Sequence, residues 1–210
     1  MKIALGIHLA EAVLPQVYLN HIGAIARWAR SYDLTLIGTY RAKVAAARNS
    51  IVDRAIKDGY SHIFFLDSDH IISDDLLDLL VESADAAMVS GLICKRIFPF
   101  DCVGFKCIEG GDLTQIVIHE RDIVKPVDAC AMGCTLVNLE EIKKLKKPYF
   151  FDARFRSDIN LCLSFRAIDC KVLLDTRAEV GHLGEPVVVR PSMAERLRIR
   201  CLEEMRLEEQ

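Results

Sequence analysis

The order of apolar runs in the first 92 residues constrains the fold more than any other feature of this chain. Apolar runs suited to buried strands alternate with stretches that have the period of a helix. Such alternation favours a doubly wound α/β sheet of mostly parallel strands flanked by helices. The length of 210 residues suits a single domain. The predicted strands in this part are residues 2–8, 34–38, 62–66 and 87–92.

Helix boundary signals support this interpretation. Pro15 suits the first turn of one helix, and Gly59 follows a second helical stretch at a position where a left-handed residue is favoured. Ser73 opens a third helix. In a sheet with right-handed crossovers, ligands bind at the carboxyl ends of the strands. We therefore expect the functional residues to follow the strands directly.

The second half of the chain has a different character. Residues 97–125 contain prolines and glycines but no long helical period, which predicts hairpins or a flexible loop over the crevice. We expect one domain over residues 1–190, which consists of a first half, 1–92, and a second half, 93–190. The other predicted elements are a strand over 127–137, a short helix after Asn138, a helix over 157–167, short strands over 171–174 and 178–180, and a charged C-terminal helix over 191–210.

Composition excludes several classes of partner. The net charge of −3 gives no basic footprint for nucleic acid. No run of 18 apolar residues is present, and Met1 leads into a strand without a secretory signal pattern, so we expect a cytoplasmic protein without a transmembrane segment. The C-terminal helix could pack on the domain or on a second copy in a homo-oligomer.

Cysteine is frequent in this chain, with eight residues and no Cys-x-x-Cys pair. The spacing of a zinc ribbon is therefore absent. Several cysteines lie in apolar runs, so we interpret them as reduced, small core residues. Disulfides are expected only if the protein is exported or its host is a hyperthermophile.

Two carboxylates follow the third predicted strand. Asp67 and Asp69 lie on either side of Ser68, directly after the apolar run 62–66. Alternate residues of extended backbone point the same way, and neighbouring like charges are unfavourable without a cation or a shifted pKa. Mn²⁺ or Mg²⁺, with phosphate oxygens completing its shell, would relieve that repulsion. The alternative is a solvated turn in which the aspartates cap the next helix.

The surroundings of these carboxylates resemble a known family. The matching segments are Arg-Asn and Phe-Phe-Leu-Asp-Ser-Asp within 48–69, Val-Asp-Ala-Cys-Ala-Met-Gly-Cys at 127–134, Phe-Phe-Asp and Ser-Asp-Ile-Asn-Leu-Cys within 150–162, and Lys-Val-Leu-Leu-Asp and Gly-His-Leu-Gly within 171–184. In this order they resemble family 2-like glycosyltransferases of the GT-A fold, over about residues 2–184. The resemblance implies one GT-A-like, Rossmann-like domain whose first half binds a nucleotide sugar and whose second half binds the acceptor.

The resemblance also implies an activity and a metal site. The protein would move a sugar from a nucleoside diphosphate sugar to an acceptor hydroxyl, with inversion. Asp67 and Asp69 would hold Mn²⁺ or Mg²⁺ against the donor diphosphate, with His182 as the third protein ligand. We interpret as structural the histidines without ligand spacing, which are His8, His21, His62, His70 and His119.

Further residues acquire roles from the same resemblance. Arg48 and Asn49 would support the nucleotide pocket, and Asp67 and Ser68 would contact the nucleotide sugar. These four residues come from the predicted second helix and the end of the third strand.

On the acceptor side, the resemblance implies that Asp158 is the base that deprotonates the acceptor hydroxyl. Asp128 and Gly133 would line the acceptor half. Ser157 stands where the family usually has a glutamate, and Asp152 is the alternative base.

Two other enzyme classes and one non-enzymatic class remain open. A haloacid-dehalogenase-type phosphohydrolase also uses an Asp-x-Asp segment, but usually on its first strand. Here the segment is on the third strand and is followed by His70. A nucleotidyltransferase is a second alternative. A catalytically silent sugar-nucleotide-binding domain is the third, and Ser157 keeps it open.

Overall fold

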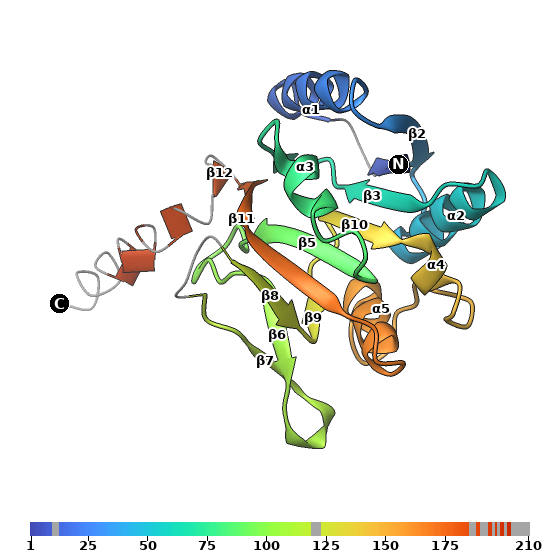
Figure 1. Cartoon of the computed structure of the whole chain (residues 1–210). Helices are drawn as coiled ribbons and strands as arrows, with labels where there is room; N and C mark the ends of the chain where they lie inside the picture. The colour runs from blue at the N-terminus through green and yellow to red at the C-terminus, as the bar shows by residue number, and fades with distance from the viewer. Residues whose placement is uncertain are drawn as a thin grey trace.

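The computed structural model describes residues 1–9, 13–118, 123–184, 188–189, 193–194, 196, 198–199 and 201–202. Within these residues, nine strands form one sheet, whose main path is β12-β11-β5-β10-β3-β1-β2 (Figure 1). Its strands are β1 (Lys2–Leu9), β2 (Asp33–Tyr40), β3 (His62–Leu66), β4 (His70–Ile71), β5 (Met88–Ile93), β8 (Val124–Val127), β10 (Cys134–Asn138), β11 (Val172–Leu183) and β12 (Val188–Val189).

A smaller sheet lies beside it, with the order β7-β6-β9. Its strands are β6 (Gly104–Cys107), β7 (Leu113–Gln115) and β9 (Ala129–Cys130), and the 3-10 turn η1 (Glu109–Gly111) joins the first two. The predicted hairpin within 97–125 is thus confirmed, because β6 and β7 pair antiparallel.

Helices cover both faces of the large sheet. They are α1 (Pro15–Trp28), α2 (Val44–Lys57), α3 (Leu76–Val81), α4 (Leu139–Ile142) and α5 (Ser157–Arg166). Alternate residues of a strand point to opposite faces, so Phe64 packs with α1 and α3 while Phe65 packs with α2 and α5. The α/β class with flanking helices is therefore as predicted.

The predicted mostly parallel sheet is wrong in one respect, because the sheet is mixed. The pairs β1–β2, β1–β3 and β5–β11 are parallel. However, β10 is antiparallel to both β3 and β5, and β4, β8 and β12 are antiparallel to β11. A parallel neighbour needs a crossover connection, usually a helix. Among the described residues between β5 and β10 there is no α-helix to make such a crossover. The chain therefore enters β10 from the edge at which β3 ends.

Three predicted strands of the second half are divided or joined differently in the structure. The run 127–137 is divided between β8, β9 and β10, because residues 131–133 leave the sheet. The runs 171–174 and 178–180 belong to one strand, β11, whose register shifts between Asp175 and Glu179. Such bulges bend a strand and re-aim the side chains beyond them.

Two further expectations concern the C-terminal helix and the absence of a membrane-spanning helix. Most of the predicted C-terminal helix over 191–210 lies outside the described residues. Among the residues that are described, no helix is both long and apolar enough to cross a membrane.

Candidate metal centre

The carboxylates after β3 lie beside the start of β10. The Asp67 backbone N–H donates to the Gly133 carbonyl at 2.8 Å, next to the antiparallel pairing of Leu66 with Cys134. Both oxygens of the Asp67 carboxylate accept from Arg48 Nη2 at 3.3 Å. Arg48 is buried on α2, so this ion pair fixes the direction of the first carboxylate.

The second carboxylate is joined to two histidines by strand pairing. In the β4–β11 ladder, His70 is directly opposite His182. The Leu183 N–H also donates to the Asp69 carbonyl at 2.8 Å. Residues separated by more than one hundred positions are thereby held at one point of the sheet.

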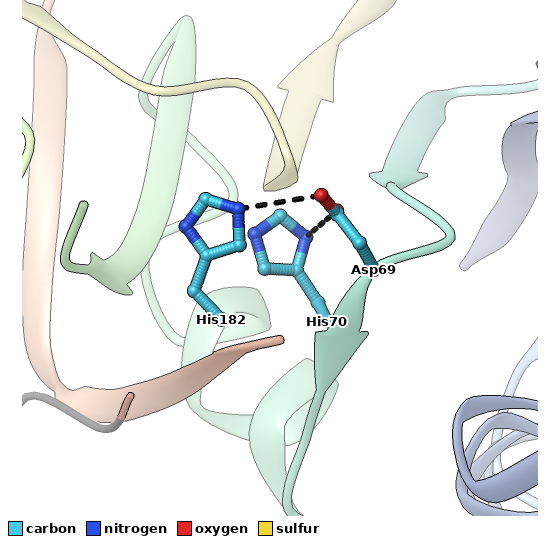
Figure 2. A group of neighbouring side chains, drawn as sticks. All are labelled: Asp69, His70 and His182. Carbon is cyan, nitrogen blue, oxygen red and sulfur yellow. Dashed lines mark hydrogen bonds and ion pairs between the residues drawn. The ribbon is translucent and has the colours of Figure 1, made fainter. Parts of the chain in front are cut away.

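Figure 2 shows the two imidazole rings turned toward the Asp69 carboxylate. His182 Nε2 lies 3.3 Å from Asp69 Oδ2, and His70 Nδ1 lies 3.6 Å from Asp69 Oδ1. One ligand atom from each residue lies within 4.8 Å of the others. One carboxylate and two imidazoles at this separation form a candidate divalent-cation site.

The hydrogen bond of His182 orients its ring for coordination. Its Nδ1 lies 2.9 Å from the Cys94 carbonyl, which only accepts, so Nδ1 carries the proton. Nε2, which faces Asp69, donates to that carboxylate when it is protonated and offers its lone pair to a cation once it is deprotonated. Metal-binding histidines are commonly oriented by such a hydrogen bond from the other ring nitrogen.

His70 has a different environment. Its side chain is buried, and neither ring nitrogen has a hydrogen-bond partner among the described residues. Buried polar atoms are nearly always paired, so a buried ring with two unpaired nitrogens calls for an explanation. Burial lowers the pKa of His70 and outweighs the opposing charges of Asp67 and Asp69. A neutral imidazole with an available lone pair suits a cation.

The titration of Asp69 and His182 reflects their contact. Burial by itself raises the pKa of Asp69, but the hydrogen bond from His182 and the neighbouring histidine and arginine side chains lower it to about 2. Burial lowers the pKa of His182, but the hydrogen bond and charge of Asp69 raise it above its ordinary value of 6.5. Asp69 is therefore ionised at neutral pH and able to bind a cation.

Gly133 leaves space where these side chains converge. A Cβ atom at this position would lie 2.2 Å from His70 Cε1, 2.9 Å from His70 Nδ1 and 3.0 Å from Asp67 Oδ2. Because real Cβ atoms do not approach so closely, only glycine fits. The His70 nitrogens have no hydrogen-bond partner among the described residues, and Gly133 has no side chain beside them. Both observations fit a cation bound beside Asp69.

Helix α1 fixes the segment that carries His70. His21 Nε2 lies 2.9 Å from the His70 carbonyl. Asn20 exchanges two 2.9 Å hydrogen bonds with the backbone of Ile72. His21 therefore makes the kind of structural contact predicted for it, whereas His70, predicted to be structural, lies in the candidate metal-binding cluster. The available sequence signal was its position directly after Asp69, but the pairing of β4 with β11 could not be read from the sequence.

The remaining donor-side residues have separate environments. Asn49 donates to the Phe150 carbonyl at 2.7 Å and accepts from the Phe150 N–H at 3.1 Å. Its amide thus ties α2 to the segment before α5 and supports the helix from which Arg48 extends. Ser68 is half-buried between the two carboxylates.

The acceptor-side residues lie around α5. Asp158 is in the first turn of α5, where its Oδ1 accepts from the Ile159 N–H at 2.9 Å. Asp152 accepts from the Ser157 N–H at 3.0 Å and so caps the helix. Asp128 accepts from the Cys107 N–H at 2.7 Å, which links β6 to the start of β9.

An electrostatic effect relates Asp158 to the strand before Gly133. The hydrogen bond with Cys162, burial and, more weakly, the Asp158 charge raise the pKa of the Cys130 thiol. Cys130 ends β9, three positions before Gly133.

Comparison with known proteins yields a likeness of fold. No protein-family model and no curated protein matches the chain. Among solved structures, A197 from STIV is similar, with a TM-score of 0.65, 17% sequence identity and 91% of each chain covered. At this identity, the similarity concerns the fold alone.

Proposed function

We propose that this protein is a metal-dependent glycosyltransferase that moves a sugar from a nucleoside diphosphate sugar to an acceptor hydroxyl. The observation that carries the proposal is the Asp69–His70–His182 cluster next to Asp67, at the carboxyl end of β3. Ligands of open α/β sheets bind at that edge. A GT-A-like fold is proposed together with this activity.

The ligand set favours Mn²⁺ over Mg²⁺. Two of the three candidate ligands are imidazoles, and imidazole nitrogen suits transition metals, whereas Mg²⁺ requires oxygen ligands. When bound, the cation would supply electrostatic stabilisation to the diphosphate leaving group. We therefore expect Mn²⁺ to bind more tightly than Mg²⁺.

The protein groups have distinct roles in this mechanism. Arg48 holds the Asp67 carboxylate in one direction toward the donor. Asp158 accepts the proton of the acceptor hydroxyl as the acceptor oxygen bonds to the anomeric carbon. The bond from that carbon to the diphosphate oxygen breaks on the opposite face, so the configuration inverts.

The test is thermal unfolding with a panel of nucleoside diphosphates, with and without Mn²⁺. A ligand that binds the native state raises the melting temperature. We expect one nucleoside diphosphate to do so only when Mn²⁺ is present. Asp69→Ala should abolish this effect, whereas Asp75→Ala should keep it, because Asp75 is exposed and its side chain makes no capping hydrogen bond to α3.

The same protein should then transfer sugar from the matching nucleotide sugar. A Mn²⁺-dependent shift that survives Asp69→Ala would contradict the proposed site. Release of phosphate from phosphomonoesters without sugar transfer would favour an Asp-x-Asp phosphohydrolase instead.

A further inference from the structure

Two cysteines face each other at the base of a loop that follows β5. Cys94 and Cys102 form an antiparallel bridge, and their sulfur atoms are 2.7 Å apart. The flanking backbone hydrogen bonds run from Lys95 N to Asp101 O at 2.9 Å and from Val103 N to Ile93 O at 2.8 Å. The cysteines therefore occupy a non-hydrogen-bonded pair, the position of an antiparallel ladder at which side chains lie closest.

The loop closed by this pair contacts two candidate metal ligands. The Cys94 carbonyl accepts from His182 Nδ1 at 2.9 Å. Arg96, two residues later, places Nη1 3.3 Å from Asp69 Oδ2. The same carboxylate oxygen also faces His182. Arg96 thus binds the Asp69 oxygen that a cation would also bind, so the two would compete for it.

The C-terminal segment holds the other side of the loop. Ala194 packs with Cys94, Phe100 and Cys102. Arg198 Nε donates to the Pro99 carbonyl at 2.7 Å. Cys94 is fully buried, while Cys102 is partly exposed, so Cys102 is the sulfur that a reagent in solution reaches first.

We propose that Cys94 and Cys102 are a modification site that forms a disulfide with a small-molecule disulfide as oxidant. The Cys102 thiolate attacks one sulfur of the oxidant and releases one thiol, and the Cys94 sulfur then displaces the second thiol from the mixed disulfide. The protein loses two protons and two electrons, and the oxidant becomes two thiols. These two cysteines then differ from the reduced core cysteines that the sequence predicts.

The consequence for the metal centre rests on the proposed function. The disulfide fixes the base of the loop and keeps Arg96 beside Asp69. A cation must displace Arg96 to reach Asp69 Oδ2, so the oxidised protein binds Mn²⁺ more weakly. Since Arg96 is largely exposed and such ion pairs are weak, we expect a loss of about two- to fivefold in affinity.

The first experiment measures the disulfide itself. The full chain is incubated with glutathione disulfide, alkylated under denaturing conditions, and analysed by mass spectrometry. We expect a linked pair of tryptic peptides, 58–95 and 97–106, because each contains one of the two cysteines and no other. Cys102→Ser should remove this species, and Cys107→Ser, a change of a half-buried cysteine on β6, should leave it intact. Absence of the linked peptides from the unsubstituted protein would overturn the proposal.

The second experiment measures Mn²⁺ affinity by calorimetry in the reduced and oxidised protein. Arg96→Gln should tighten Mn²⁺ binding and remove its dependence on oxidation. Equal affinity in both redox states of the unsubstituted protein would refute the link to the metal centre. If the disulfide forms and Mn²⁺ binds neither state, the proposed function fails while the modification site stands.

Discussion

Gly133 is a position at which the neighbouring side chains leave no room for a Cβ atom. In Gly133→Ala, the added methyl group would meet the His70 ring, which is buried and cannot move aside. We expect a loss of about 1–3 kcal/mol of unfolding free energy, as for other overpacked sites, together with weaker Mn²⁺ binding. Urea unfolding and calorimetry would measure the two effects.

Gly23→Ala is the matched control. Gly23 is on the exposed side of α1, and a Cβ there meets nothing within 4 Å. Alanine is favoured over glycine in a helix by about 1 kcal/mol, so this variant should be slightly more stable. Unchanged stability and Mn²⁺ affinity in Gly133→Ala would show that the close packing of His70 against Gly133 does not matter for folding or for metal binding.

His182 should make Mn²⁺ binding depend on pH. Its Nε2 coordinates a cation only when deprotonated, and its pKa is raised above 6.5. Mn²⁺ affinity should therefore fall as the pH drops through this raised pKa, and His182→Gln should flatten the profile. Calorimetric titrations between about pH 5 and 8 would measure it.

Without metal, the same contact has the opposite dependence on pH. A pKa that is raised in the folded state gives stability that is present below the unfolded value and is lost as the pH rises through the folded value. The His182–Asp69 pair should thus stabilise the metal-free protein most under mildly acidic conditions. Affinity that rises at low pH would contradict the assignment of His182 as a ligand.

At the scale of elements, α5 determines the position of Asp158. The residue lies in the first helical turn, where its Oδ1 accepts from the Ile159 N–H at 2.9 Å. Asp158→Asn should leave donor and Mn²⁺ binding nearly intact while lowering turnover by about a hundredfold or more, the effect of losing a general base. Initial rates and nucleotide-binding titrations would separate these effects.

Asp152→Ala is the informative comparison. Asp152 caps α5 through the Ser157 N–H, and loss of such a cap lowers stability by about 1 kcal/mol. This variant should therefore be less stable but retain its rate constant. Full transfer activity in Asp158→Asn, with none in Asp152→Ala, would move the base to Asp152.

At the scale of the whole molecule, the two halves of the chain share one sheet. β10, from the second half, separates β3 from β5, and Asn49 links α2 to Phe150 across 101 positions. A fragment of residues 1–92 would expose the apolar edges left by β10. We expect this fragment to remain unfolded, which circular dichroism and amide exchange would test against the full chain.

Addition of a separately produced 93–210 fragment should restore structure if the interface between the halves provides the missing pairing. Cooperative unfolding of the isolated 1–92 fragment would show instead that the first half is an independent unit.

The sequence alone determined the elements whose patterns are local. The strand 62–66 is β3 with the same bounds, and Asn138 caps α4 through the Glu140 N–H. Apolar runs, capping residues and helical periods act over a few positions, so they can be recognised without the fold. The polar Asp67-Ser68-Asp69 segment at the end of a buried strand was recognisable for the same reason.

Tertiary structure decided which of these residues meet. The antiparallel direction of β10 and the pairing of β4 with β11 are contacts between distant segments, and no local pattern encodes them. These pairings bring His70 beside His182 and Asp69, while Asp67 pairs with Arg48. Strand order and register depend on how all the apolar faces are buried together, so a two-residue strand such as β4 acquires its partner only in the folded sheet.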